Sequence, residues 1–190
     1  MPSSRSSTRT KKSPSAVQYS TARRDISRLK RLHSFFEILA GAVLEDFHSD
    51  KPLLHTLYTF LSRTTRFIDA PAGAIYRVEN KTVSLLGDVS YSDKLRIFVV
   101  KASLADSHVR SAVRTKKVHI CTAREKAGLP GTTIGKSRLV DSSIIHIPVI
   151  VHKKVIGVVE YIGAPVSEDK EYFALFCAKT ARPFAVLLEV

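Results

Sequence analysis

The sequence predicts an α+β domain: an antiparallel sheet of about six strands, with helices from both ends of the chain packed on one of its faces. Two runs rich in β-branched residues, 144–151 and 155–162, flank the short polar segment 152–154, which is typical of a hairpin. Apolar residues recur at helical spacing near both ends of the chain. Helices at the ends and strands between them favour an α+β fold.

The length and composition fit one domain with a short extension. The chain has 190 residues, of which 44% are hydrophobic, enough to bury a sizeable core. No apolar run reaches the roughly 18 to 20 residues that span a bilayer. Two cysteines give no disulfide framework and favour a reducing, cytoplasmic setting. We divide the chain into a basic disordered or docking tail, 1–22, and a domain, 23–190.

The net charge of +13 is concentrated near the N-terminus. Residues 1–24 contain six basic side chains and no acidic one: Arg5, Arg9, Lys11, Lys12, Arg23 and Arg24. Such a segment favours an anionic partner, which can be an acidic protein assembly such as tubulin, an anionic membrane surface or, nonspecifically, nucleic acid. A solubilising tail and a cleaved mitochondrial transit peptide are the alternatives, although the tail lacks the apolar face of a transit peptide.

The first long helix is predicted from Arg23 onward. Its apolar seam recurs at spacings of three and four: Ile26, Leu29, His33, Phe36, Ala40, Val43 and Phe47. Leu32, Phe35 and Leu39 widen this stripe. One row can face the sheet while the other faces a partner helix, so the segment 25–47 is a candidate homo- or heterodimer interface. A helix buried within its own domain is the alternative.

The middle of the chain predicts shorter elements. Asp50 is expected to cap a second helix that has Pro52 in its first turn and ends before residue 69. The Ser103–Asp106 capping box predicts a further helix. The remaining elements are strands 73–78, 82–86 (closed by Gly87 and Asp88), 95–100 and 118–121, and the helix 104–114 with Val109 and Val113 inward.

Four residues in the C-terminal half carry local predictions. Pro148 lacks an N–H and should face a bulge or a gap in the ladder, whereas Gly157 should permit a close approach by a helix or a ligand. Ser167 is expected to cap the last helix. Pro183 should kink or break that helix near Thr180.

The segment 122–141 is the longest irregular stretch after the tail, and long loops of this kind are usually functional. The segment 131–137 has only three residues between its glycines, where a phosphate-binding loop requires four. We therefore interpret it as a lid over an anionic ligand, in which backbone N–H groups and basic side chains bind the anion. The candidate pocket and lid residues are Thr132, Thr133, Gly135, Lys136, Ser137, Arg138 and Ser143.

No catalytic constellation is evident. Cys121 and His119 should point to the same face of a strand, but a buried structural cysteine is the more common situation. Carboxylates are sparse and unpaired in the apolar half. Four histidines lack the short spacing of metal ligands: His108, His119, His146 and His152. We predict a non-catalytic protein with no metal and no cofactor.

Several of these segments resemble the GAF domain family over residues 36–188. They are the segments 69–78 and 112–121, and the hairpin with Ile147-Pro148-Val149 and Val155-Ile156-Gly157-Val158. The resemblance implies a domain that senses small molecules between the sheet and a lid and that often dimerises through its end helices. The cyclic-nucleotide signature begins at Asn80-Lys81 but does not continue, and the lid cysteines of bilin-attaching and methionine sulfoxide reductase branches are missing.

Two functional hypotheses follow. In the first, the protein is a non-catalytic structural or adaptor subunit whose basic tail and surface dock on an acidic assembly, such as the microtubules of a cilium or flagellum. In the second, it is a regulatory domain that senses a cyclic nucleotide or an anionic metabolite.

Overall fold

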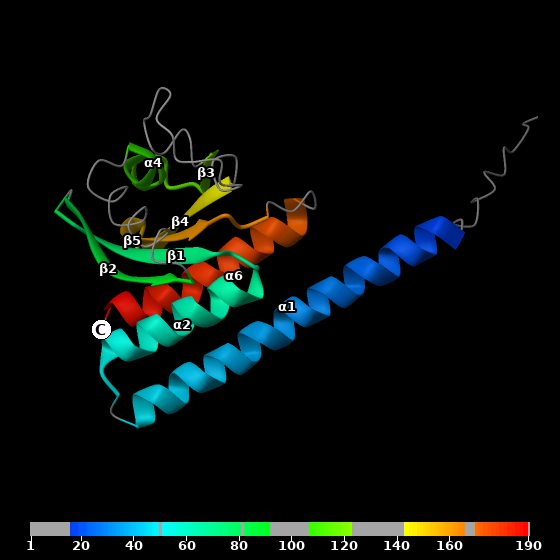
Figure 1. Cartoon of the computed structure of the whole chain (residues 1–190), viewed down its shortest axis with the longest axis horizontal. Coiled ribbons are helices and arrows are strands. Elements are labelled where there is room, and N and C mark those ends of the chain that lie inside the picture. Colours follow the sequence, from blue (N-terminus) through cyan, green and yellow to red (C-terminus); the bar gives the residue numbers. More distant parts are fainter. Residues whose placement is uncertain are drawn as a thin grey trace, which may run out of the picture.

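The computed structural model of the chain describes residues 16–49, 51–80, 82–91, 107–122, 143–165 and 170–189. Figure 1 labels its elements in chain order. They are α1 (Ala16–His48), α2 (Leu53–Phe67), β1 (Ala72–Glu79), β2 (Thr82–Ser90), α4 (Ser107–Thr115), β3 (His119–Thr122), β4 (Ser143–Val151), β5 (Lys154–Ile162) and α6 (Lys170–Glu189).

The strands form one antiparallel sheet in the order β2-β1-β5-β4-β3. The predicted hairpin is confirmed as β4 and β5, which pair from Ile144 opposite Ile162 to Val151 opposite Lys154. The described residues contain five strands, one fewer than the approximate prediction. The expected strand 95–100 lies outside the described residues.

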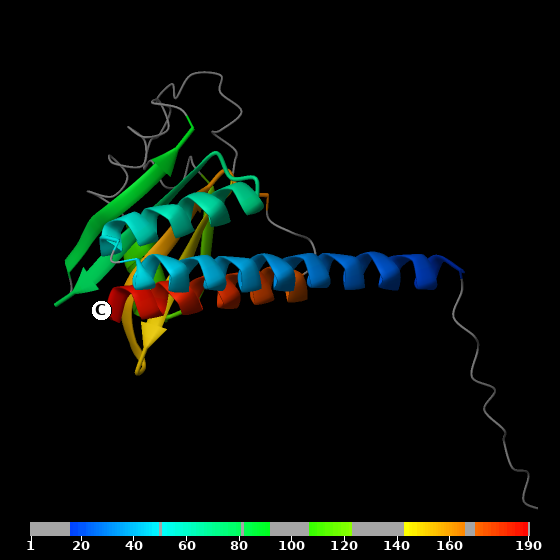
Figure 2. The ribbon, with the colours of Figure 1, turned by 90° about the horizontal axis from the view of Figure 1, so that it is seen from below.

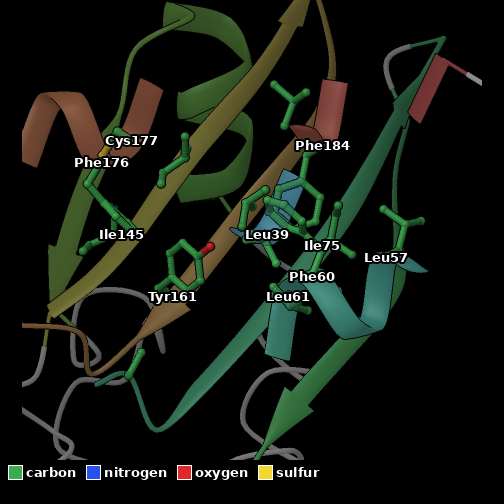
Figure 3. Close-up of a cluster of buried hydrophobic side chains, with 14 of the residues drawn as sticks. Leu39, Leu57, Phe60, Leu61, Ile75, Ile145, Tyr161, Phe176, Cys177 and Phe184 are labelled. Carbon is green, nitrogen blue, oxygen red and sulfur yellow. The ribbon is translucent and has the colours of Figure 1, made fainter. Parts of the chain in front are cut away.

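Three helices cover one face of the sheet. Figure 1 shows α1, α2 and α6 on this side and α4 on the opposite side, so the predicted packing of both end helices on one face is confirmed. Figure 3 shows the resulting core, in which helix side chains meet the strands. Phe60 and Phe184 stack edge to face with ring centroids 4.6 Å apart, and both are fully buried.

Helix α1 differs from its prediction at its start and in its buried stripe. It begins at Ala16, so its first residues belong to the segment that we assigned to the tail. The side chains of Leu32, Phe36 and Leu39 are buried, whereas Ile26 is 53% exposed and Leu29 is 38% exposed. The N-terminal part of α1 extends past the other elements in Figures 1 and 2 and therefore has fewer neighbours to bury its seam.

Other boundaries correct the sequence analysis. Pro52 occupies the N-cap position of α2 and makes no side-chain cap, instead of lying in the first turn. Strand β2 runs through Gly87 and Asp88, because both pair with β1. Helix α6 continues past Pro183 without a break at Thr180. The predicted caps Asp50, Ser103–Asp106 and Ser167 lie outside the described residues.

Pro148 and Gly157 behave as predicted. Pro148 is next to a register shift between Val149 and Ile150, and β3 pairs with β4 only as far as His146. A Cβ atom on Gly157 would collide with the Leu188 side chain of α6 and lie 2.9 Å from the Tyr76 carbonyl oxygen. Glycine therefore allows α6 to pack directly on β5.

Among the described helices, none combines the length and the apolar character that crossing a membrane requires.

Candidate functional site

The sheet face beneath α4 carries polar side chains among its apolar ones. Ile145, Ile147 and Val159 belong to the core on the helix-covered face, whereas Ile144 and Val158 pack in a smaller cluster on the α4 face. Successive side chains of a strand alternate between the two faces of the sheet. The residues that alternate with Ile145, Ile147 and Val159 along β4 and β5 therefore point toward α4. Among those residues are His146 of β4 and Glu160 of β5.

Strand register aligns these residues into a row across the sheet. His119 of β3 lies opposite His146 of β4, which lies opposite Glu160 of β5, which lies opposite Ala74 of β1. Directly opposite side chains on one face of an antiparallel sheet are close enough to interact. We call His119, His146 and Glu160 the histidine row.

The inner part of the row is fully buried. Neither His146 nor Glu160 exposes any side-chain area, and His146 Nε2 lies 2.9 Å from Glu160 Oε2. The Tyr76 hydroxyl donates a hydrogen bond of 3.3 Å to the other carboxylate oxygen of Glu160. A buried carboxylate is costly unless it is paired and hydrogen-bonded, and these two neighbours supply both kinds of contact. Glu160 therefore has the partner that sequence analysis did not find.

The outer part of the row meets helix α4. His108 Nδ1 of α4 lies 2.9 Å from His119 Nε2, and the two rings stack with centroids 5.2 Å apart. Cys121, two residues after His119 on β3, is 5% exposed. One ligand-type atom from each of His108, His119 and Cys121 lies within 4.8 Å of the other two. We call these three side chains the His–Cys cluster.

Sequence spacing did not reveal the His–Cys cluster, because its members come from a helix and a strand that only tertiary packing brings together. The predicted shared face of His119 and Cys121 is consistent with their place in the cluster. One usable signal was present: His146 and Glu160 each interrupt an otherwise apolar strand, and such residues are usually paired or functional.

A cavity of about 320 Å³ lies on the opposite, helix-covered side of the sheet. Its apolar wall includes Phe67, Tyr172 and Phe176, and α1 contributes the two arginines Arg28 and Arg31. The guanidinium carbon of Arg31 is 5.8 Å from the centroid of the Phe67 ring. Its lining also contains one carboxylate, Asp69, so the arginines leave it with a net positive charge. This volume is at the lower end of the range for small-molecule sites.

Most of the site residues predicted from the sequence are not among the described residues that form the histidine row or the wall of this cavity. The lid residues Thr132, Thr133, Gly135, Lys136, Ser137 and Arg138 lie outside the described residues, as do Arg5, Arg9, Lys11 and Lys12. Ser143 begins β4 opposite Thr122 of β3 and is half-buried. Arg23 lies in α1, where its side chain is not described, and Arg24 is exposed on the same helix.

Comparison with known proteins gives a match at the level of structure alone. No protein-family model matches the sequence, and no curated protein matches it. Among solved structures, the GAF domain of a phosphoenolpyruvate-protein phosphotransferase from Coxiella burnetii is 14% identical, with a TM-score of 0.58 over 83% of this chain and 92% of that chain. The fold is that of a GAF domain. The GAF domain of the Acinetobacter phosphoenolpyruvate-protein phosphotransferase is 16% identical, with a TM-score of 0.54 over 86% of this chain and 96% of that chain.

An enzyme also has a similar structure. The free methionine-R-sulfoxide reductase from Neisseria meningitidis, solved with its substrate, is 14% identical, with a TM-score of 0.52 over 83% of this chain and 86% of that chain. At these identities the likeness establishes the GAF-like fold and leaves the chemistry to this chain's own residues. In this GAF-like domain the histidine row and the arginine-lined cavity occupy opposite faces of the sheet.

Proposed function

We propose that this protein is a ligand-sensing regulatory domain, and that its ligand is a small anionic molecule with an apolar or aromatic body. The cavity between α1 and α6 carries this proposal, because it combines two arginines with aromatic walls. Planar guanidinium groups bind carboxylate and phosphate oxygens through paired hydrogen bonds. Cyclic nucleotides and anionic metabolites with a ring have the required chemistry.

The position of the cavity suggests how binding is transmitted. Arg28 and Arg31 belong to α1, whereas Tyr172 and Phe176 belong to α6 and Phe67 ends α2. A ligand that contacts the α1 arginines and the aromatic residues of α2 and α6 at the same time would hold α1 against the rest of the domain. Because α1 extends beyond the domain in Figures 1 and 2, a change in its attachment would reach a partner bound to its far end.

The proposed role is binding and not catalysis. Arg28 and Arg31 supply charge, and the aromatic residues supply apolar contact. A cavity so furnished recognises a molecule without requiring a nucleophile or a general base. The Neisseria enzyme has a similar fold, so assays for reductase activity on free methionine sulfoxide are the matching control for this proposal.

A thermal-shift titration of the full chain against cyclic nucleotides and anionic metabolites tests the proposal. A ligand at 100 times its dissociation constant stabilises the folded state by about 2.7 kcal/mol. For a chain of this size that corresponds to roughly 5–10 °C in the unfolding midpoint. The shift should disappear in R28A/R31A and persist in K30A, since Lys30 is exposed on α1 and does not line the cavity. Equal shifts in both variants would contradict binding at this cavity.

The second candidate is the adaptor role, which the charge of α1 favours. Arg24 and Lys30 are exposed on the part of the helix that precedes its buried stripe, next to Arg28 and Arg31. A basic helix that extends from a domain can dock on an acidic assembly such as ciliary or flagellar microtubules. Nonspecific binding to nucleic acid uses the same charges.

Co-sedimentation with polymerised tubulin tests the adaptor role. We expect the full chain to co-sediment, and both chain 25–190 and the variant R24E/K30E to bind more weakly, because each loses basic charge from the tail or from α1. Added salt should also weaken binding, because exposed charges are screened. A parallel experiment with double-stranded DNA separates a specific acidic assembly from any polyanion. Binding that is equal for both polymers, or that survives removal of residues 1–24, would contradict the tail-mediated adaptor role.

The exposed apolar stripe of α1 supports dimerisation through the helix 25–47. Ile26, Leu29 and Leu44 are 53%, 38% and 59% exposed, and their spacing places them on one side of the helix. A second copy, or a related helix of another chain, would cover this side. We therefore keep homo- or heterodimerisation as a proposal.

A further inference from the structure

The His–Cys cluster unites ligand atoms that transition metals prefer. His108 of α4 and His119 of β3 supply imidazole nitrogens, and Cys121 of β3 supplies a sulfur. Imidazole and thiolate groups bind Zn²⁺ and related ions, whereas Mg²⁺ and Ca²⁺ prefer oxygen ligands. The chemistry of the cluster therefore points to a first-row transition metal.

We propose that His108, His119 and Cys121 bind one Zn²⁺ ion. Binding uses His108 Nδ1, His119 Nε2 and the Cys121 thiolate, and it releases the thiol proton to solvent, since metal ligands must be deprotonated. In tetrahedral coordination, two such nitrogens lie about 3.4 Å apart and each lies about 3.6 Å from the sulfur.

Small side-chain rotations bring the cluster to this geometry. The two ring nitrogens lie 2.9 Å apart, and all three ligand atoms lie within 4.8 Å of one another. The nitrogens must separate by about half an ångström to reach a tetrahedral arrangement. Their contact in the metal-free state requires one N–H to donate to the other nitrogen. On metal binding, that proton moves to the other nitrogen of the same ring, so that both facing nitrogens donate a lone pair to the ion and both rings stay neutral.

The surroundings favour a site with one open position. Three protein ligands leave a fourth tetrahedral place for water or another small ligand, as in zinc sites that bind exchangeable ligands. His108 and His119 are partly exposed, which gives an ion access, while Cys121 is buried. The ring of His146 lies beside the cluster, 5.8 Å from that of His119, and connects it to Glu160.

This inference goes beyond the proposed function and does not rest on it. The His–Cys cluster lies on the α4 face of the sheet, and the arginine-lined cavity lies on the other face. If the wild-type protein does not bind Zn²⁺ but still responds to an anionic ligand, the metal-site proposal alone is overturned. If the wild-type protein binds Zn²⁺ but does not respond to an anionic ligand, the proposed function alone is overturned.

The test uses the full chain, reduced, stripped with a chelator and titrated with Zn²⁺ in a competing buffer. We expect one Zn²⁺ per chain, unaffected by excess Mg²⁺. H108Q and C121S should each bind at least about tenfold more weakly, because each removes one of three ligands. H152Q is the matched control: His152 is 92% exposed in the β4–β5 turn, and its loss should leave affinity unchanged.

Cobalt provides a second readout that reports the sulfur directly. Co²⁺ bound by wild type should show a thiolate-to-cobalt charge-transfer band, and C121S should lack it. Circular dichroism of the metal-free variants checks their fold, and H108Q decides the question if C121S does not fold. The proposal is overturned if wild type binds Zn²⁺ no better than H108Q, or if the Co²⁺ complex has no thiolate band.

Discussion

His146 and Glu160 lie directly opposite each other on β4 and β5, with Nε2 2.9 Å from Oε2 and both side chains fully buried. This pair places a carboxylate in the middle of an apolar sheet face, where an unpaired one would be strongly unfavourable. It also connects the interior of the domain to the His–Cys cluster at the sheet edge through the neighbouring His119.

Removing both partners of this pair should cost less than the sum of the costs of removing each one alone. We expect E160L to lower the free energy of unfolding by about 3–5 kcal/mol, because buried His146 loses its neighbouring carboxylate and the Tyr76 hydroxyl loses its hydrogen-bond acceptor. H146L/E160L should be less destabilised than the sum of the single variants, since apolar replacements of buried pairs are often tolerated. Urea denaturation of the full double-mutant cycle measures this, and additive costs would rule out coupling.

Gly157 should be intolerant of any side chain. A Cβ there meets Leu188 and the Tyr76 carbonyl oxygen, so we expect G157A to destabilise the domain by about 1–3 kcal/mol. Gly41 of α1 provides the matched control, because nothing lies within 4 Å of its added Cβ. G41A should be neutral or stabilise by about 0.5–1 kcal/mol through helix propensity. Thermal unfolding in which both variants behave alike would contradict the close packing of α6 on β5.

Cys177 should make stability fall at alkaline pH. Burial raises the pKa of its thiol to about 12, from an ordinary value of 9.0. The folded state therefore retains a proton that the unfolded chain loses, and stability decreases as the pH rises through this interval. Burial also raises the pKa of the Tyr161 hydroxyl, which acts in the same direction.

The contribution of Cys177 to the loss of stability at alkaline pH can be isolated by comparing the free energies of unfolding of wild type and C177A in denaturant at pH 8 and pH 10.5. Between these pH values C177A should lose less stability than wild type, because it lacks the thiol that must ionise on unfolding. Equal losses in both proteins would mean that the thiol ionises similarly in the folded and unfolded states.

The exposed stripe of α1 leads to a prediction about oligomeric state. We expect a dimer in light scattering coupled to size exclusion, and a monomer for L29E/L44E, because charges in a helix interface oppose association. E45Q is the control and should leave the mass unchanged, because Glu45 is exposed on the same helix but lies about 100° around it from this stripe. A monomeric wild type would exclude homodimerisation under these conditions.

The elements that the sequence predicts well are those with a local cause. The β-branched runs around residues 152–154 specify the β4–β5 hairpin, and Gly157 marks the approach of α6. The start of α1 at Ala16 was missed, because its first residues continue a segment rich in Ser, Thr, Arg and Lys, a composition that favours a disordered tail. Of the kink or break predicted at Pro183, the break was wrong, because α6 continues through Pro183 to Glu189 with Phe184, Leu187 and Leu188 buried beyond it.

The candidate sites were harder to predict, because they depend on contacts between distant segments. His119, His146 and Glu160 meet only through strand register, and His108 joins them through the docking of α4. The cavity combines residues of α1 with residues about 140 positions later in α6. Neither arrangement leaves a spacing pattern that a single sequence can reveal.

The most direct test of the central claim is calorimetric titration of the anionic ligand that gives the largest thermal shift, into wild type, K30A and R28A/R31A. Hydrogen bonds to charged groups contribute about 1.5–3 kcal/mol each. We therefore predict that R28A/R31A binds at least about tenfold more weakly than wild type while K30A binds equally. Unchanged affinity in R28A/R31A, with heat and stoichiometry like those of wild type, would contradict a ligand site between α1 and α6.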